Sequence, residues 1–270
     1  MTASHPLKIG VSGASGRMGK ALLTVLDTRP DVTVAALVDR PELAGRSVHG
    51  RPLATLAEAL EACEVIIDFS TPAATLALAE AAAAGGGPAL VLATTGLSDE
   101  EAARIDRAAQ AIPVVRSGNF SLGVNLLAGL VRQAARALAA EDWDIEVFEA
   151  HHRRKVDAPS GTALMLGEAA AAGRGVDLSE VSERARDGLT GPRPPGAIGF
   201  SVARGGGIVG EHAVLFAAEE EIITLSHSAR DRSLFARGAI EAALWAVGRA
   251  PGLYDMQDVL GLRPAAPTGA

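Results

Sequence analysis

Hydrophobic and polar residues follow two alternating patterns along the first 116 residues of the chain, short β-branched runs and alanine-rich segments. The short apolar runs predict strands that are buried on both faces, and the segments between them predict helices. The predicted strands are Leu7–Ser12, Val32–Val38, Val65–Phe69, Ala89–Ala93 and Pro113–Arg116. The predicted helices are Arg17–Leu26, Leu56–Ala62, Pro72–Ala84 and Ser98–Ala111, the last with a capping box of Ser98 and Glu101. This alternation predicts a Rossmann-type α/β fold with a parallel sheet.

The pattern changes after Asn119 and predicts a second, α+β domain. Its predicted elements are the amphipathic helix Val124–Ala139, the strand Ile145–Ala150, the polar loop His151–Ser160, the helix Thr162–Ala172, the Gly/Pro/Arg-rich stretch Arg184–Gly196, and the strands Ile198–Arg204, Ile208–Phe216 and Glu221–Ser228. Short turns join the last three strands, which predicts that these strands run antiparallel, in a mostly antiparallel or mixed sheet.

A final predicted helix, Ser233–Gly248, is expected to return to the first domain. We therefore expect one domain made of residues 1–120 plus 232–270 and a second made of residues 121–231. The tail, Leu262–Ala270, is rich in Pro, Ala and Gly and is expected to be frayed.

Composition narrows the class of protein. The chain is 48% hydrophobic and 21% charged with a net charge of −7, which excludes extensive disorder and argues against nucleic-acid or membrane-surface partners. The single cysteine, Cys63, cannot form an internal disulfide, fits a reducing compartment and is expected to be a small core residue. Met1–Pro6 does not resemble a signal peptide, and no apolar stretch approaches the roughly 20 residues of a membrane helix. We expect a cytoplasmic protein.

A glycine-rich turn joins the first predicted strand to the first predicted helix. It reads Gly10-Val-Ser-Gly13-Ala-Ser-Gly16-Arg17-Met18-Gly19, with the spacing G-x-x-G-x-x-G, a variant of the dinucleotide fingerprint. A phosphate can approach a turn that lacks Cβ atoms, and the helix N-terminus offers free N–H groups. The alternative is a tight turn with no ligand, but the position between a strand and a helix favours a dinucleotide.

Asp39 stands at the end of the second predicted strand, where a carboxylate can accept hydrogen bonds from the ribose hydroxyls of NAD. The next residue, Arg40, could instead pair with the 2′-phosphate of NADP. Asp39 favours NADH and Arg40 favours NADPH, so the cofactor is expected to be one or the other.

Small polar residues follow two further predicted strands. Asp68-Phe69-Ser70-Thr71-Pro72 follows the third strand and Ala93-Thr94-Thr95-Gly96 the fourth. Ligands bind at the carboxyl ends of parallel strands in this fold, so both segments could line the nicotinamide ribose. Each could equally be an ordinary helix-capping loop.

The stretch from Glu149 to Ala163 carries the densest set of reactive groups. It reads Glu-Ala-His151-His152-Arg-Arg-Lys155-Val-Asp-Ala-Pro-Ser-Gly161-Thr162-Ala. Basic residues precede a Ser-Gly-Thr segment that opens a predicted helix, a combination suited to binding a carboxylate. The histidines could act as a general acid or as donors to a substrate. A solvated basic loop is the alternative, which the nearby cofactor motif disfavours.

Lys155 is one of only three lysines among 25 basic residues. An arginine cannot give up a proton at working pH, whereas an ammonium can if burial and neighbouring cations lower its pKa. Lys155 is therefore the predicted proton donor.

These motifs resemble the dihydrodipicolinate reductase family, also called 4-hydroxy-tetrahydrodipicolinate reductase. The matching segments are GVSGASGRMG at 10–19, DFSTP at 68–72, ATTG at 93–96, GNFSLGVN at 118–125, EAHHRRKVDAPSGTA at 149–163 and IVGEH at 208–212. They span nearly the whole chain in the family's order.

The resemblance implies roles for individual residues. It places the nucleotide loop at Gly13, Ala14, Ser15, Gly16, Arg17 and Met18, the ribose site at Asp39 and Arg40, and the nicotinamide side at Ala93, Thr94, Thr95, Gly118, Asn119, Phe120 and Ser121. It also implies that His151 is the acid/base, that His152 and Lys155 bind substrate and donate a proton, and that Gly161 and Thr162 bind a carboxylate. The chain departs from the common pattern in the proline-rich segment between Gly191 and Gly196 and in Asp39, where some members carry Glu.

The implied reaction is reduction of the cyclic dicarboxylate 4-hydroxy-tetrahydrodipicolinate to tetrahydrodipicolinate by NADH or NADPH, with loss of water, in diaminopimelate and lysine biosynthesis. The resemblance also implies a homotetramer built through the sheet of the second domain. We further expect closure between the domains, which would exclude water, and no metal. Two alternatives remain, another small-substrate reductase on this fold and a nicotinamide-sensing regulatory module. The His-His…Lys loop favours an enzyme, because a sensor needs no proton donor.

Overall fold

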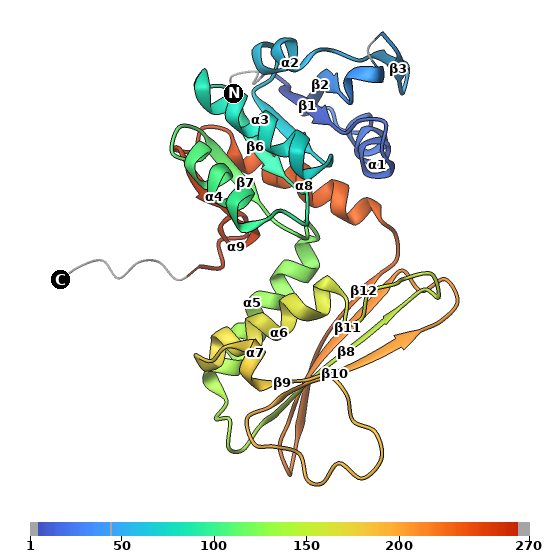
Figure 1. Ribbon diagram of the computed structural model, residues 1–270, viewed down its shortest axis with the longest axis vertical. Helices are drawn as coiled ribbons and strands as arrows, with labels where there is room; N and C mark the ends of the chain where they lie inside the picture. The colour runs from blue at the N-terminus through green and yellow to red at the C-terminus, as the bar shows by residue number, and fades with distance from the viewer. Residues whose placement is uncertain (1–4, 44, 264–270) are drawn as a thin grey trace, which may run out of the picture. The chain divides into compact units, whose positions relative to one another are not determined.

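The chain forms two units. The computed structural model describes residues 5–43 and 45–263 of the 270 in the sequence. One unit contains the residues up to Leu122 together with those from Ser233 onward, and the other is Gly123–Arg232 (Figure 1). These boundaries lie within two residues of the expected ones. Most of the tail that was expected to be frayed, residues 264–270, lies outside the described residues.

The first unit is built on a six-stranded, entirely parallel sheet of order β13-β7-β6-β5-β1-β2. Its strands are β1 (Leu7–Ser12), β2 (Val32–Val38), β5 (Val65–Asp68), β6 (Ala89–Leu92), β7 (Pro113–Arg116) and β13 (Gly252–Tyr254). Every residue of β5 and β6 is buried, as the unbroken apolar runs predicted for strands covered on both faces. The predicted Rossmann-type fold is confirmed. Among the strands of this sheet only β13 was not foreseen, because its three residues show no periodicity.

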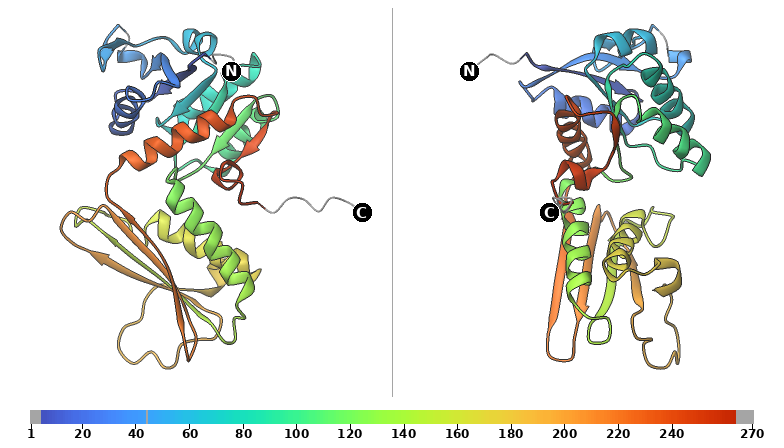
Figure 2. Two further views of the ribbon diagram at one scale, coloured as in Figure 1. Left: turned by 180° about the vertical axis from the view of Figure 1, so that it is seen from behind. Right: turned by 90° about the vertical axis from the view of Figure 1, so that its left-hand side faces the viewer.

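Helices cover both faces of this sheet (Figures 1 and 2). One face packs against α1 (Arg17–Leu26) and α8 (Ser233–Ala246), and the other against α2 (Leu56–Ala62), α3 (Pro72–Ala84) and α4 (Asp99–Ala108). The short elements are η1 (Pro41–Leu43), β3 (Ser47–Val48), β4 (Arg51–Pro52) and α9 (Met256–Val259). The predicted capping box at Ser98 and Glu101 is present at the start of α4. The predicted return of the chain into the first unit is therefore made by α8, which completes one of its two layers.

Small residues allow α8 to approach the rest of the first unit closely. Six of its seven buried residues are Ala or Gly, the exception being Ile240. A Cβ built on Gly238 would lie 1.7 Å from the main-chain oxygen of Phe120. The helix is thus in direct contact with the backbone that leads out of β7, and that contact requires a glycine.

The second unit has a five-stranded mixed sheet of order β12-β11-β8-β10-β9. Its strands are β8 (Asp144–His151), β9 (Ser182–Glu183), β10 (Ile198–Arg204), β11 (Gly210–Ala217) and β12 (Ile222–Ala229). The helices α5 (Leu122–Ala137) and α6 (Gly161–Arg174) pack on one face, and α7 (Leu178–Val181) follows α6 (Figure 1). Along β11 buried residues alternate with half-exposed ones, as in a sheet covered on one face only.

The last three strands run antiparallel to one another in succession, as predicted, but not all of them are neighbours. The strands β11 and β12 pair directly, whereas β10 does not pair with β11. Instead β8 lies between them, parallel to β10 and antiparallel to β11. The reason is the long connection through α6, which is the crossover that parallel strands require and which returns the chain to the far side of β8.

Among the described residues, no helix is both long enough and apolar enough to cross a bilayer.

We predict that Gly238→Ala strongly destabilises the protein, because its Cβ would overlap the Phe120 carbonyl. The expected loss is about 3 kcal/mol or more, the scale of backbone-displacing substitutions, measured by urea unfolding. Gly85→Ala at the end of α3 is the matched control, because a Cβ there meets nothing within 4 Å. Equal stabilities of the two variants would contradict the proposed packing.

Candidate active site

The glycines of the turn between β1 and α1 are required by the packing of the turn itself. Gly13 has a φ of +74°, and its Cβ would lie 2.6 Å from the main-chain oxygen of Phe69 after β5. A Cβ on Gly19 would lie 2.3 Å from the oxygen of Gly13. These contacts draw the start of α1 against the carboxyl ends of two central strands, which is where the fold binds ligands.

The N-terminus of α1 fits a pyrophosphate. Its N-cap is Gly16, whose lack of a side chain leaves the first turn without a side-chain cap. The first turn contains no acidic residue, and its first residue, Arg17, is exposed. The N–H groups and positive end of a ten-residue helix are therefore open to an anion. Ser15 and Met18 are half-buried beside them, whereas Ala14 is fully buried and can contribute only through its backbone.

The predicted ribose carboxylate is bonded to the glycine turn. Asp39 Oδ2 accepts a hydrogen bond of 2.7 Å from the N–H of Ser15, and Oδ1 accepts one of 2.8 Å from the N–H of Arg40. Burial raises the pKa of Asp39, but these main-chain donors outweigh it and lower the pKa. The Arg40 side chain is 73% exposed. Asp39 thus fixes the turn while each oxygen keeps a second lone pair for a ribose hydroxyl.

A fully buried carboxylate, that of Asp68 at the end of β5, lies between a threonine of α3 and one that follows β6. Asp68 Oδ2 lies 2.5 Å from the hydroxyl oxygen of Thr75 and 3.1 Å from that of Thr94. The two hydroxyl oxygens are 2.7 Å apart. The hydroxyl of Thr94 is therefore engaged inside the protein, whereas Thr95 is exposed, and a Cβ on Gly118 would lie 3.8 Å from its methyl group. Thr95 and Gly118 form the surface that a nicotinamide could contact.

The segment after β7 contains the remaining residues predicted to lie beside the nicotinamide, and they have different structural roles. The side-chain oxygen of Asn119 accepts a hydrogen bond from the N–H of Ser121, which shapes the turn. Phe120 is 2% exposed and packs edge-on against Phe69, so its side chain belongs to the core. Phe120 can serve a cofactor only through its main chain.

In the second unit, the carboxyl end of β8 carries a buried glutamate and a histidine on the same face. Residues two apart along a strand share a face, and Glu149 and His151 both point to the helix side of the sheet. Glu149 Oε2 lies 2.6 Å from His151 Nδ1. Burial raises the pKa of Glu149, but hydrogen bonds from Arg204, His151 and the N–H of Ser160 outweigh it and lower the pKa.

A second histidine, His212 of β11, lies across the strand pair from Glu149. Its Nε2 is 3.3 Å from the hydroxyl of Ser160, the N-cap of α6, and its ring meets that of His151 edge-on at 5.1 Å. Burial is the main cause that lowers the pKa of His212 to about 4. His212 is therefore a neutral ring near neutral pH.

Two residues of the loop after β8, Lys155 and His152, each contact one other side chain. Lys155 Nζ pairs with Asp157 Oδ2 at 2.9 Å, and this hydrogen bond lowers the pKa of the Asp157 carboxyl. His152 Nε2 lies 3.4 Å from the guanidinium of Arg232, which follows β12. Arg153 and Arg154 are exposed.

Gly161 and Thr162 begin the 14-residue α6. Gly161 is exposed, so a carboxylate can reach the N-terminus of this helix.

The structure adds residues to which the sequence assigned no role: Thr75, Glu149, Arg204, His212 and Arg232. The available signal for Glu149 was its position two residues before His151 in a predicted strand. Arg204 lies 55 residues from Glu149, so no local pattern could connect them.

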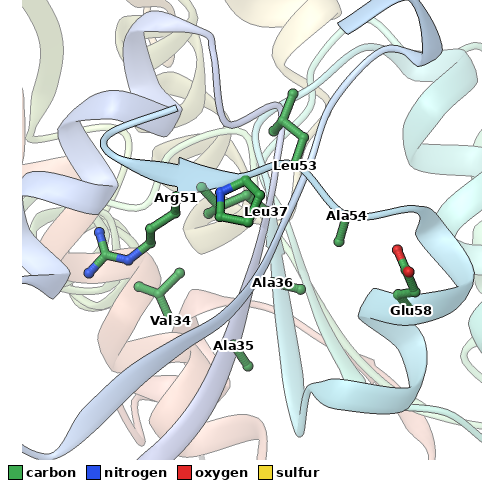
Figure 3. A pocket seen from close by; sticks show the side chains of 9 residues that line it. Val34, Ala35, Ala36, Leu37, Arg51, Leu53, Ala54 and Glu58 are labelled. Carbon is green, nitrogen blue, oxygen red and sulfur yellow. The ribbon is translucent and has the colours of Figure 1, made fainter. Parts of the chain in front are cut away.

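A pocket of about 520 Å³ lies elsewhere, along the edge strand β2 (Figure 3). It is lined by Val34–Leu37, Arg51–Ala54 and Glu58 and contains none of the predicted site residues. Within residues 5–43 and 45–263, no three or more His, Cys, Asp or Glu side chains are grouped to hold a metal ion.

A parallel α/β unit with a dinucleotide turn, followed by a unit with a cationic, histidine-containing loop, defines a nicotinamide-dependent oxidoreductase. Sequence models of dihydrodipicolinate reductase match this chain at residues 7–120 for the N-terminus and 123–260 for the C-terminus. The chain belongs to the dihydrodipicolinate reductase family.

Individual relatives agree with this membership. A 4-hydroxy-tetrahydrodipicolinate reductase of Caulobacter vibrioides is 64% identical over 96% of this chain and 99% of that protein. One of Roseobacter denitrificans is 55% identical over 96% of this chain and 98% of that protein. The solved structure of a dipicolinate-bound dihydrodipicolinate reductase from Paenisporosarcina sp. TG-14 has a TM-score of 0.77 at 21% identity, covering 94% of this chain and 99% of that one, which supports the fold.

We predict that His212 makes the stability of the protein sensitive to mild acid. Its pKa falls from 6.5 in the unfolded chain to about 4 when folded, so its contribution is complete above pH 6.5 and is lost as the pH falls toward 4. The groups that act on this ring are His151, Glu149, His227 and Lys155. Between pH 7.5 and 5 the wild type should lose roughly 2 kcal/mol more unfolding free energy than His212→Gln.

Urea unfolding at both pH values measures this difference. His5→Gln, at an exposed position, should retain the wild-type dependence. The same pH dependence in His212→Gln and the wild type would show that His212 is not held neutral by the fold.

Proposed function

We propose that this chain reduces 4-hydroxy-tetrahydrodipicolinate to tetrahydrodipicolinate with loss of water, in diaminopimelate and lysine biosynthesis. The observation that carries the proposal is the gathering of His151, His152, Lys155 and Arg232 around the loop that leads into α6. Cations beside an open helix N-terminus suit a substrate with two carboxylates. The solved relative from Paenisporosarcina holds dipicolinate, a dicarboxylate of similar shape.

The residues of the second unit divide the work of binding and proton transfer. Gly161 and Thr162 offer the first N–H groups of α6 to one carboxylate, and His152 with Arg232 faces the substrate as a pair. His151 serves as acid/base through Nε2, because Nδ1 is bonded to Glu149. Lys155 supplies a proton from Nζ once substrate draws it from Asp157. The nicotinamide supplies the hydride when bound.

We propose that both NADH and NADPH serve as cofactor, held by the turn from Gly13 to Met18. Asp39 keeps acceptor capacity for the ribose hydroxyls of NADH. Arg40 is exposed, and its Nε is 3.7 Å from Asp39, so its guanidinium can turn toward a 2′-phosphate. On the nicotinamide side, Ala93, Thr95 and Gly118 supply the accessible surface.

We also propose a cytoplasmic homotetramer assembled through the second unit's sheet. The face opposite α5 and α6 carries exposed apolar side chains, including Phe148 and Ile222, which are 40% and 63% exposed. An apolar sheet face of this kind is typical of subunit contacts. The cytoplasm is where a biosynthetic reductase of this family would meet its substrate and cofactor.

We predict that the protein consumes NADH and NADPH when supplied with the product of aspartate semialdehyde, pyruvate and a synthase. Absorbance of the reduced nicotinamide measures the reaction. His151→Ala and Lys155→Ala should each lower kcat by roughly 10²-fold or more, the usual scale for a general acid. No absorbance change with either cofactor would contradict the proposed function and favour another substrate or a sensing module. Wild-type turnover in either variant would contradict only that residue's role.

We predict that Asp39→Ala weakens the binding of NADH more than the binding of NADPH, because only NADH relies on this carboxylate to hold its adenosine ribose. The dissociation constants of both cofactors, measured by fluorescence titration, test the prediction. Arg40→Ala is the matched variant and should weaken the binding of NADPH more than the binding of NADH. An equal loss of affinity for the two cofactors in Asp39→Ala would remove Asp39 from the ribose site.

A further inference from the structure

The carboxylate of Glu149 is surrounded by N–H donors. The side chain is 1% exposed. Oε2 accepts from His151 Nδ1 at 2.6 Å and from Arg204 Nη1 at 2.8 Å. Oε1 accepts from the main-chain N–H of Ser160 at 3.0 Å and from Arg204 Nη2 at 2.8 Å. A carboxylate only accepts, so both of its oxygens are needed to satisfy these partners.

This arrangement decides which nitrogen of His151 carries a proton at rest. An ionised carboxylate at 2.6 Å requires a proton on Nδ1, which leaves the lone pair on Nε2. The neighbour of Nε2 is Gly210 of β11, on which a Cβ would lie 3.2 Å from that nitrogen. A side chain at position 210 would therefore crowd Nε2, whereas glycine leaves it accessible.

The same carboxylate also holds the start of the carboxylate-binding helix. Ser160 donates its N–H to Glu149, while its hydroxyl caps α6 by accepting from the N–H of Ala163. Arg204 closes the arrangement from β10, because Nη2 also donates to the main-chain oxygen of Asp157 at 2.7 Å. One side chain thus sets both the ring of His151 and the turn that precedes Gly161.

We propose that Glu149 is a positioning residue for the reduction, which holds His151 in the Nδ1–H tautomer and in register with the Ser160–Gly161 turn. This inference rests on the acid/base role proposed for His151. Glu149 does not itself contact substrate. When His151 takes a proton on Nε2, the imidazolium that results faces a carboxylate that is already in place and desolvated. Arg204 keeps that carboxylate ionised and oriented.

The variant Glu149→Gln separates this role from simple packing. An amide of the same shape has one acceptor oxygen and one NH₂ group. Among the four contacts of Glu149, only the imidazole can change from donor to acceptor, because the Ser160 N–H and the guanidinium always donate. The NH₂ should therefore take the place of Oε2, where it loses only the bond from Arg204 Nη1, rather than that of Oε1, where it would lose two. There it faces His151 and converts it to the Nε2–H tautomer.

The experiment measures the tautomer and the kinetics of the full-length protein. Long-range ¹H–¹⁵N correlation spectra report which imidazole nitrogen is protonated, with the His151 signals assigned by their loss in His151→Asn. In Glu149→Gln we expect the Nε2–H form, a kcat lowered by about 10- to 100-fold, and a displaced pH profile of kcat. Cofactor affinity should not change, because the first unit carries the nucleotide turn.

Two further variants serve as controls. Glu146→Gln is matched, because Glu146 lies on the same strand and pairs with Arg186 and Arg193, but it lies on the other face and has no contact with His151. It should retain wild-type kcat and tautomer. Arg204→Lys keeps the positive charge but not the paired hydrogen bonds, so His151 should keep the Nδ1–H form. If Glu149→Gln does not fold, Glu149→Asp, in which the shortened carboxylate withdraws from His151, takes its place with the same readouts.

A wild-type tautomer together with a wild-type pH profile in the folded Glu149 variant would overturn the proposal. The tautomer readout does not depend on turnover, so it decides the role of Glu149 even if the proposed substrate is wrong. Conversely, full activity of His151→Ala would contradict the acid/base role of His151. The tautomer of His151 could still be compared between the wild type and Glu149→Gln.

Discussion

Burial of a single carboxylate constrains the second unit. An unpaired charge inside a protein costs several kcal/mol, so Glu149 must collect enough donors to offset its desolvation. It draws them from β8, β10 and the first turn of α6. Because His151 and Ser160 stand at the two ends of one loop and bond to the same side chain, the loop is closed at its base. The residues between them, His152 and Lys155 included, are presented on a fixed frame.

The first unit uses a carboxylate in a related but weaker way. Asp39, at the end of β2, accepts the N–H of Ser15 from the turn beside it, much as Glu149 accepts the N–H of Ser160. In both units an acidic side chain at a strand end fixes a turn that opens a helix. The difference is the number of donors: Asp39 accepts two main-chain N–H groups and keeps acceptor capacity, whereas Glu149 accepts four hydrogen bonds and can act only through its neighbours.

The sequence predicted features that depend on local spacing. The periodic strands, the glycine turn and the His-His…Lys loop all lie within short windows, and the parallel sheet follows from their alternation. Pairings across the chain were not predictable, because Arg204 meets Glu149 over 55 residues and His212 meets Ser160 over 52. The sequence placed Lys155 beside other cations, but in the structure its ammonium pairs with the carboxylate of Asp157, two residues away. Phe120 matched a cofactor motif, yet its aromatic ring fills the core.

The split of the first unit along the chain has a consequence for synthesis. The strands β1 to β7 emerge from the ribosome before the second unit, yet α8 and β13, which cover one face and one edge of their sheet, are made last. Until then the buried residues of β5 and β6 lack part of their cover and are prone to non-specific association. The second unit contains its own helices and sheet and can fold during that interval. The late arrival of a small, alanine-rich helix therefore determines when the parallel sheet of the first unit becomes covered on both faces.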